Sequence, residues 1–157
     1  MKKNNLKLKV LVMSLITVFL VALIGSFFTS KNTNTPWYES IKPEITPPSY
    51  VFPIVWNTLF FLIALSLYFS WINKTKNKKV LALAFGINFF LNILWSYLFF
   101  YLKQIRLAFF EIIILEISII YLIIYTYKID KKASYLLIPY LIWVGFASVL
   151  NYLAAFR

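Results

Sequence analysis

The chain has 157 residues, of which 62% are hydrophobic and only 13% are charged. An average soluble domain is about 45–50% apolar and about 25% charged, so these proportions exclude a soluble globular protein and favour one that is embedded in lipid. The net charge of +11 arises from 16 Lys and Arg residues against 5 Asp and Glu residues. Because the basic residues lie between apolar runs, they indicate membrane topology rather than nucleic-acid binding.

The sequence contains no Cys and no His. This composition excludes disulfides, thiol nucleophiles, Cys/His zinc sites and the common axial ligands of haem. There is also no Gly-rich phosphate loop and no pairing of a nucleophile with a base. The sequence therefore predicts no metal site, no resident cofactor and no ordinary hydrolytic or redox catalysis.

Five apolar runs are each long enough to cross a hydrocarbon core about 30 Å thick, which requires about 20 helical residues. The runs comprise residues 10–28, 51–72, 80–102, 107–127 and 133–156. The first run follows a basic start, but it is longer than the apolar part of a cleaved signal peptide, about 7–15 residues, so we expect a retained helix. The predicted fold class is all-α integral membrane, a five-transmembrane-helix bundle that forms a single domain over residues 1–157.

The connection at residues 29–50 is long for a link between two helices, and loops of this length tend to be functional or disordered. It contains four prolines together with Trp37 and Tyr38. Prolines restrict the backbone and aromatic rings pack, so we interpret this connection as an ordered lid. An interfacial aromatic belt is the alternative interpretation of Trp37 and Tyr38.

The basic residues on the connections predict the orientation of the chain. Eleven lie at the N-terminus and on the second and fourth connections, against five on the opposite side. The first group is Lys2, Lys3, Lys7, Lys9, Lys74, Lys76, Lys78, Lys79, Lys128, Lys131 and Lys132; the second is Lys31, Lys42, Lys103, Arg106 and Arg157. By the positive-inside rule, we expect a multi-pass protein with its N-terminus in the cytoplasm and its C-terminus outside. The membrane that we expect to hold it is a bacterial cell membrane.

Three of the runs carry aromatic or polar residues at helical spacing, which places them on one face of each helix. These are Phe52, Trp56, Phe60 and Ile63; Asn88, Asn92, Trp95 and Phe99; and Tyr140, Trp143, Ala147, Leu150 and Ala154. Since amides are costly in hydrocarbon, the asparagines should face the bundle interior. Aromatic side chains opposite small ones suit a flat conjugated ligand, although ordinary packing explains the same spacing.

Glu111 and Glu116 are the two acidic residues inside a predicted span. Glu111 lies about one turn from the start of its run, where it can reach the interface or pair with Arg106. Glu116 lies near the middle, where an ionisable group suggests a function by default, while a hydrogen-bonded structural role is the alternative. At five residues apart, the two carboxyl groups point to different faces and do not form a paired acid/base site.

In its motifs the chain resembles the TspO/translocator protein family, the tryptophan-rich sensory proteins once called peripheral benzodiazepine receptors. The matching stretches run from Trp37 to Asn151: Trp37-Tyr38, Lys42-Pro43, Pro47-Pro48, Val51-Phe52, Trp56, Asn88, Asn92-x-x-Trp95-Ser96, Phe99-Phe100, Pro139-Tyr140-x-x-Trp143, Phe146-Ala147 and Leu150-Asn151. Where several bacterial relatives carry tryptophan between the Lys-Pro and Pro-Pro elements, this chain has Glu44-Ile45-Thr46, so its lid contains fewer aromatic residues.

The resemblance implies a five-helix bundle, often a homodimer, whose first loop covers a ligand cavity. It implies porphyrin or another aromatic hydrophobic molecule as the ligand, and membrane lipid as the surroundings. The expected binding residues are Trp37, Phe52, Trp56, Asn92, Trp95, Phe99, Tyr140, Trp143, Ala147 and Leu150. In some bacterial members cavity tryptophans are implicated in light-dependent porphyrin breakdown, which makes Trp56 and Trp143 the candidate catalytic residues.

Three functions follow as hypotheses. The first is a porphyrin-binding protein that acts as a sensor, buffer or scavenger. The second is a light-dependent porphyrin-degrading enzyme, and the third is a transporter of tetrapyrroles or other amphipathic molecules. The pair Ala82-x-x-x-Gly86 permits close helix approach, either within the bundle or between two copies.

Overall fold

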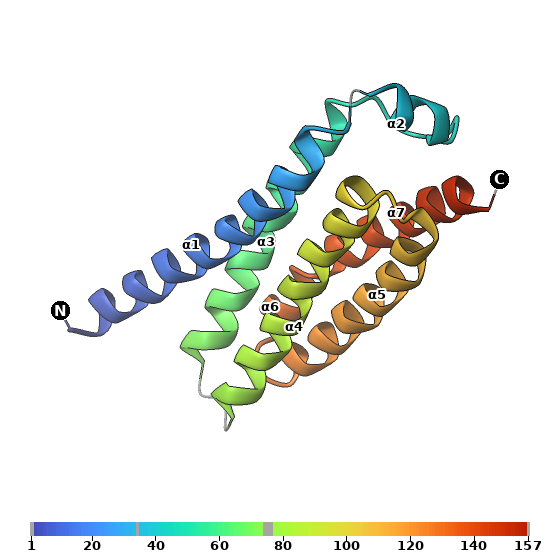
Figure 1. Ribbon diagram of the computed structural model, residues 1–157. Coiled ribbons are helices and arrows are strands. Elements are labelled where there is room, and N and C mark those ends of the chain that lie inside the picture. Colours follow the sequence, from blue (N-terminus) through green and yellow to red (C-terminus); the bar gives the residue numbers. More distant parts are fainter. Residues whose placement is uncertain (1, 34, 74–76, 157) are drawn as a thin grey trace.

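The computed structural model describes residues 2–33, 35–73 and 77–156, and in this part of the chain every regular element is helical (Figure 1). The long helices are α1 (Lys2–Ser30), α3 (Val51–Ile72), α4 (Lys78–Ser96), α5 (Ile105–Tyr127) and α7 (Ile138–Ala155). Short elements are α2 (Pro36–Ile41), α6 (Lys131–Tyr135) and a π-helical turn, η1 (Tyr97–Tyr101).

Five segments of the described chain are long and apolar enough to cross a membrane, with α6 and α7 together forming the last one. The predicted fold class is therefore confirmed. The second run begins and ends as predicted, at Val51 and Ile72. The protein is a multi-pass integral membrane protein, because its helices expose large apolar side chains along most of their length.

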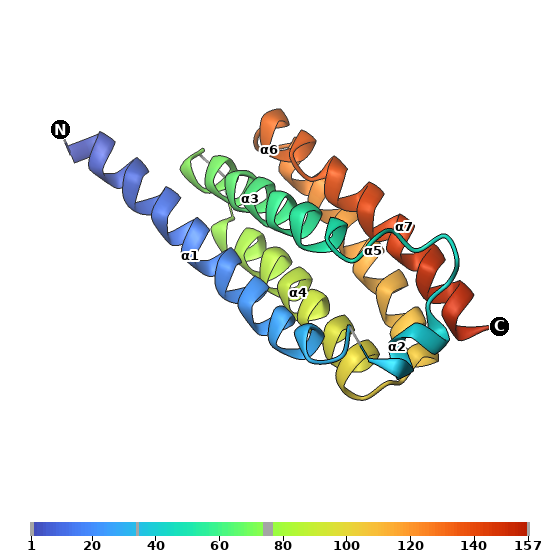
Figure 2. The same ribbon diagram turned by 90° about the horizontal axis from the view of Figure 1, so that it is seen from above.

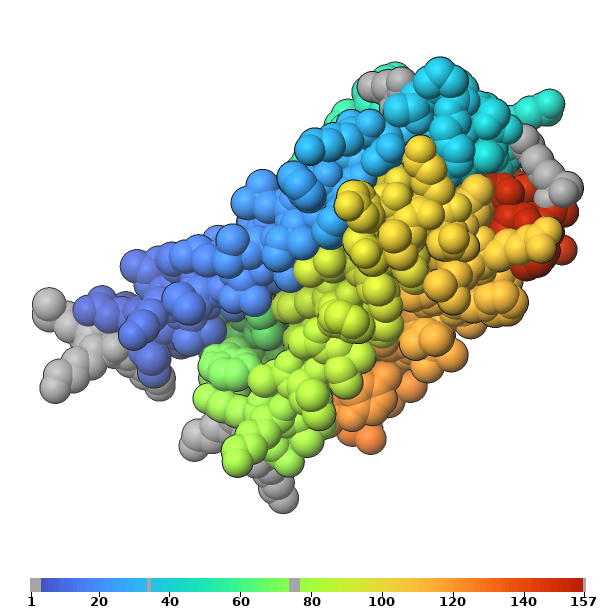
Figure 3. All heavy atoms as spheres, viewed as in Figure 1, coloured from blue at the N-terminus to red at the C-terminus, as the bar shows by residue number. Residues whose placement is uncertain are grey.

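The helices form a ring in which neighbours in space are not always neighbours in sequence. α1 packs against both α3 and α4, while α5 packs against α4 and α7. α6 closes the ring near the end of α3, and α3 and α7 lie side by side with little backbone contact (Figure 2). The N-terminal part of α1 projects beyond the rest of the bundle (Figure 3).

Four of the five segments begin earlier than the apolar runs predict. α1 starts at Lys2 rather than at residue 10, and α4 starts at Lys78 rather than at residue 80. α5 starts at Ile105 rather than at residue 107, and the last segment starts with α6 at Lys131 rather than at residue 133. Hydropathy marks only the apolar part of a helix, whereas backbone hydrogen bonding continues into polar residues until a cap ends it. At α4 this cap is Asn77, whose side-chain oxygen accepts a 3.2 Å hydrogen bond from the Val80 amide.

The last predicted run, residues 133–156, is divided into α6 and α7. In a continuous helix, Pro139 would have no amide hydrogen to donate to the Tyr135 carbonyl, and its ring would clash with that carbonyl. The chain therefore turns at Leu136 and Leu137 before α7 begins at Ile138. α6 has its own N-cap, since the Asp130 carboxylate accepts hydrogen bonds from the amides of Lys132 and Ala133 at 2.7 and 3.2 Å.

The third run also departs from a simple helix, because α4 ends at Ser96 and the chain continues as η1. The Leu102 amide donates to the Tyr97 carbonyl at 2.9 Å, the wider spacing that defines a π-turn. The turn to α5 is then completed by Lys103, which adopts a positive φ of 56°. This geometry places Phe99 and Phe100 against the short helix α2.

Candidate ligand cavity beneath the lid

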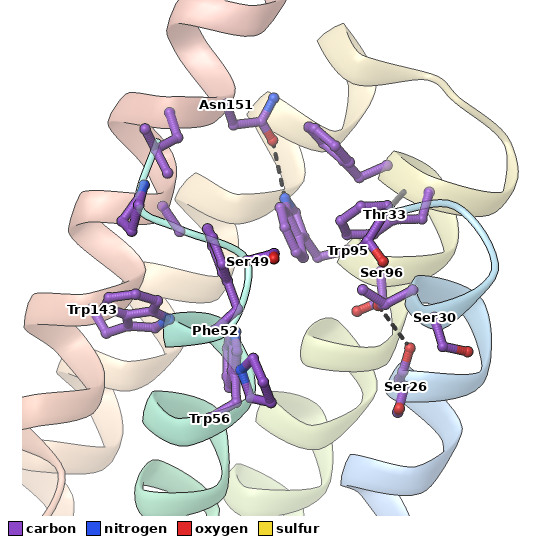
Figure 4. A pocket seen from close by; sticks show the side chains of 18 of the residues that line it. Ser26, Ser30, Thr33, Ser49, Phe52, Trp56, Trp95, Ser96, Trp143 and Asn151 are labelled. Atoms are coloured by element: carbon purple, nitrogen blue, oxygen red, sulfur yellow. Dashed lines mark hydrogen bonds between the residues drawn. The ribbon is translucent and has the colours of Figure 1, made fainter. Parts of the chain in front are cut away.

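A cavity of about 840 Å³ lies between α1, α3, α4 and α7 and beneath the described residues of the first connection, 31–33 and 35–50 (Figure 4). Ligand pockets typically measure about 300–1,000 Å³, so the cavity is large enough for a sizeable planar molecule. α5 closes its far wall with Ile112 and Leu115.

Of the ten binding residues expected from the sequence, eight line this cavity: Phe52, Trp56, Asn92, Trp95, Phe99, Trp143, Ala147 and Leu150. Trp37 and Tyr140 are not among the lining residues. Trp37 packs outside it, 6.1 Å from the Phe99 ring and beneath the Lys103 ammonium group at 5.1 Å. Tyr140 is buried behind Trp56, and the two ring centroids are 6.3 Å apart.

Three tryptophans reach the cavity from three different helices. Trp56 comes from α3 and is stacked on Phe60 at 5.4 Å, and Trp95 comes from α4 and is stacked on Phe99 at 5.2 Å. Trp143 comes from α7 and meets the Phe52 ring edge-on at 5.8 Å. The members of each stacked pair are four residues apart, within α3 for Trp56 and Phe60 and across the junction of α4 and η1 for Trp95 and Phe99. The cavity is therefore walled by flat aromatic surfaces in several orientations.

Asn151 fixes the position of one of these tryptophans. Its side-chain oxygen accepts a 3.0 Å hydrogen bond from Trp95 Nε1, and its amide nitrogen donates to the Ile105 carbonyl at 2.9 Å (Figure 4). Asn151 was not among the expected binding residues. Its signal in the sequence is its place four residues after Ala147, which puts both on the same face of α7.

A second polar network lies deeper in the bundle. Asn92 Nδ2 donates to the Tyr140 hydroxyl at 3.1 Å, and that hydroxyl lies 3.4 Å from Asn88 Oδ1. Asn88 Nδ2 in turn donates to the Ser118 hydroxyl at 2.8 Å. Both asparagines therefore face the interior, as the cost of an unpartnered amide in hydrocarbon predicts. Tyr140 serves as a hydrogen-bonding wall behind the cavity lining.

The lid is built around α2, which begins with favourable capping. The Thr35 hydroxyl accepts a 3.3 Å hydrogen bond from the Tyr38 amide, and Pro36 occupies the first helical position, where its missing donor costs nothing. The ring of Tyr38 lies 5.9 Å from that of Phe100. Tyr38, and not Trp37, lines the cavity on this side. The residue that faces inward depends on the rotation of α2, which hydropathy does not report.

Charged groups appear only at the rim of the cavity among the described lining residues. Lys42 Nζ forms a 2.7 Å ion pair with the Glu39 carboxylate, and both side chains are substantially exposed. Burial raises the pKa of the Tyr38 hydroxyl above its ordinary value of 10.0, and the negative charge of Glu39 adds to this shift. The phenol therefore remains neutral at physiological pH.

α1 contributes a hydroxyl-bearing wall that the sequence interpretation did not identify. Ser26 and Ser30 of α1, and Thr33 in the turn that follows it, line the cavity at intervals of four and three residues, opposite the aromatic walls (Figure 4). The same helical periodicity that marked the tryptophans marks these hydroxyls, but serine and threonine are common at helix ends and carry a weaker signal.

The two acidic residues of α5 lie outside the cavity lining. Glu111 is 5% exposed, and neither of its carboxylate oxygens has a hydrogen-bond partner in the described part of the chain. Arg106, its possible partner, instead donates through Nε to the Ala155 carbonyl at 3.3 Å. Glu116 Oε1 accepts a 2.8 Å hydrogen bond from the Ser148 hydroxyl of α7.

Within the described residues, no three acidic, histidine or cysteine side chains come together as a metal site would require. The lining instead offers aromatic faces, hydroxyl groups and the amide side chains of Asn57, Asn92 and Asn151. Such a set binds by stacking, apolar contact and neutral hydrogen bonds.

Comparison with known proteins yields consistent matches. A model of the TspO/MBR family matches residues 13–156. A tryptophan-rich protein TspO from Archaeoglobus fulgidus is 42% identical over 143 residues, which cover 90% of this chain and 92% of that protein. A tryptophan-rich protein TspO from Chlorobaculum tepidum is 35% identical over 136 residues, with coverage of 84% and 85%. A translocator protein from Sus scrofa is 28% identical over 140 residues, with coverage of 85% and 83%.

Proposed function

We propose, since the chain belongs to the TspO/MBR family, that it binds porphyrin or another flat, aromatic, hydrophobic ligand in the cavity beneath its lid. In this role it acts as a membrane sensor, buffer or scavenger of such molecules. Relatives carry the names tryptophan-rich sensory protein, in Cereibacter sphaeroides, and translocator protein, in Sus scrofa.

The observation that carries this proposal is the convergence of Trp56, Trp95 and Trp143 on one cavity of about 840 Å³. A favourable aromatic pair contributes about 0.5–1.5 kcal/mol beyond the burial of its area. Several such contacts with one planar ligand give useful affinity without any charged group or metal ligand. Trp56 and Trp95 already stack on Phe60 and Phe99, which line the same cavity and extend its aromatic surface.

The polar residues of the cavity suggest how the ligand is oriented. Ser26, Ser30 and Thr33 lie along one wall, and Lys42 lies at the rim in an ion pair with Glu39. An amphipathic ligand with an aromatic body and polar edge groups matches this distribution when its edge faces α1 and the lid. The aromatic body then occupies the space between Trp56, Trp95 and Trp143.

Light-dependent degradation of the bound porphyrin is the second candidate function. It is favoured by one observation, the presence of Trp56 and Trp143 in the same cavity, where their indoles would lie against an excited tetrapyrrole. Transport is the third hypothesis, and the name translocator protein of a relative agrees with it. Glu116, the ionisable residue near the middle of its span, lies outside the cavity lining and lends transport no support.

A titration with protoporphyrin IX tests these functions. Purified protein is titrated in the dark, and tryptophan quenching and the porphyrin absorption band are followed. We expect saturable binding at one site per chain. Illumination of the complex then tests degradation, and counterflow in proteoliposomes tests transport. Absence of saturable dark binding would refute the proposal.

A further inference from the structure

A second hollow lies on the opposite side of Trp143 from the main cavity. It is a groove of about 630 Å³ between α3 and α7, lined by Ile54, Val55, Thr58, Leu59, Leu62, Pro139, Ile142, Trp143 and Phe146. Its one hydroxyl, that of Thr58, donates to the Ile54 carbonyl of its own helix at 2.9 Å. The groove therefore presents an apolar surface.

Trp143 lines both the groove and the main cavity. In Figure 4 its ring extends from α7 towards Phe52 and Trp56 of α3. The backbones of α3 and α7 make little contact where the groove lies. α3 packs more closely against α6 than against α7. Side chains, and Trp143 above all, thus separate the two hollows.

Trp143 lacks the hydrogen bond that holds Trp95 in place. Trp95 donates a 3.0 Å hydrogen bond to Asn151, whereas Trp143 Nε1 is buried without any partner in the described part of the chain. Its ring contacts are edge-on or tilted, with Phe52 at 5.8 Å and Phe146 at 5.7 Å. Rotation of the Trp143 ring therefore breaks no hydrogen bond of this group. It also lets the Nε1–H group, which has no partner in its present position, reach a new acceptor.

The groove faces the hydrocarbon of the membrane. Thr58 lies seven residues inside α3, about 10 Å from its start, and Ile142 lies near the middle of the span formed by α6 and α7. Both side chains are exposed. At the lid end, by contrast, Tyr38, Pro43 and Pro47 cover the cavity. A molecule dissolved in the bilayer meets the groove before it meets the lid.

We propose that the groove is the membrane-side entry site of the cavity for flat molecules with an apolar aromatic body, such as protoporphyrin IX, and that the Trp143 ring is the movable partition between groove and cavity. This inference rests on the proposed ligand-binding function. A ligand first lies in the groove against Ile142 and Thr58, and it then passes into the cavity as the Trp143 ring rotates.

The absence of cysteine in the chain permits a clean test. The variant T58C places a single thiol in the groove, outside the lining of the main cavity. A benzyl methanethiosulfonate reagent then fills the groove reversibly. The control is I117C on α5, which is also exposed to lipid but lies away from the groove. Stopped-flow mixing with protoporphyrin IX in liposomes, in the dark, gives association and dissociation rates before modification, after it and after reduction.

We expect modified T58C to bind and release porphyrin at least about tenfold more slowly, which corresponds to about 1.4 kcal/mol in the barrier. Its equilibrium affinity should remain unchanged, reduction should restore both rates, and modified I117C should show no effect. If only lipid chains occupy the groove, modified T58C should show unaltered rates. That result would overturn the proposed entry site and leave the proposed binding function intact. Slower association without slower release would also overturn the entry site, because the groove would then be part of the binding site. Absence of binding to the unmodified proteins would refute the proposed function, and the entry site with it.

Discussion

Single side chains of the cavity walls carry the proposed affinity. Replacement of Trp56 or Trp143 by Ala should weaken dark binding of protoporphyrin IX by a few-fold to about tenfold, since a lost aromatic pair costs about 0.5–1.5 kcal/mol and tenfold in affinity is about 1.4 kcal/mol. Both residues line the same cavity. Fluorescence titration of each variant in the dark measures the effect.

Phe is the matched control at the same two positions, because it retains a ring. Trp56→Phe and Trp143→Phe should largely preserve dark binding while they remove any chemistry of the indole. Unchanged dark affinity in both Ala variants would contradict a shared binding chamber. If the parent protein binds porphyrin in the dark but does not degrade it in light, the proposed binding function stands and the light-dependent enzyme is excluded.

Glu116 is expected to act through its hydrogen bond with Ser148, which joins α5 to α7 at 2.8 Å. Glu116→Gln keeps an oxygen that can accept this bond, so we expect little change in melting temperature or porphyrin affinity. Glu116→Ala should lower stability by about 0.5–1.5 kcal/mol, the usual net contribution of one hydrogen bond. Thermal unfolding in detergent compares the two variants. A changed pH dependence of binding in Glu116→Gln would instead indicate a functional carboxyl group.

At the scale of the element, the lid depends on how α2 sits against η1. Trp37 packs on Phe99, and Tyr38 packs on Phe100. Two consecutive aromatic residues of α2 therefore contact two consecutive rings of the π-turn. The π-turn thus supplies the surface on which the lid rests. A regular α-helix through residues 97–101 would rotate these rings relative to α2, because each residue turns an α-helix by about 100°.

The raised pKa of Tyr38 predicts an alkaline weakening of this lid. Since the pKa is higher in the folded protein than the ordinary 10.0 of an unfolded chain, the stabilisation is complete below that value and is lost as the pH rises through the folded pKa. Between about pH 9 and about pH 11, the parent should lose more melting temperature than Tyr38→Phe. Tyr50→Phe is the control, because Tyr50 lies in the same connection and is 67% exposed. Equal losses in the parent and Tyr38→Phe would contradict the prediction.

For the whole molecule, five spans place the two termini on opposite sides of the membrane, and the start of α1 and the end of α7 do lie at opposite ends of the bundle (Figure 1). The eleven-to-five distribution of Lys and Arg predicts a cytoplasmic N-terminus. Of these residues, Lys74, Lys76 and Arg157 and the side chains of Lys2 and Lys3 lie outside the described part of the chain. A reporter active only in the cytoplasm should give signal at the N-terminus alone, and activity at the C-terminus would contradict the orientation.

Association of two copies is expected through the exposed face of α4. Ala82 and Gly86 both lie on this face, and a Cβ atom added at Gly86 would meet nothing within 4 Å. Gly86→Leu therefore fits within one chain but should prevent close approach of a second helix. Light scattering of the purified protein should show a dimer for the parent and a monomer for Gly86→Leu, with equal melting of the monomeric fold. A dimer in both would place the interface elsewhere.

The sequence alone determined the fold class, the five spans and the faces that carry the tryptophans and asparagines. Hydropathy and helical periodicity are local properties, so a single chain reports them without knowledge of its partners. This is why Val51–Ile72 was predicted to the residue, and why Asn88 and Asn92 were expected to face inward.

Only the tertiary structure decided which side chains converge. It placed Tyr38 rather than Trp37 over the cavity, paired Trp95 with Asn151, and brought Ser26 and Ser30 of α1 opposite the aromatic walls. It also divided the last span before Pro139 and left Trp143 between two hollows. Each of these depends on how one helix is rotated and spaced relative to another, and that arrangement is set by packing between residues far apart in the chain, which no local pattern encodes.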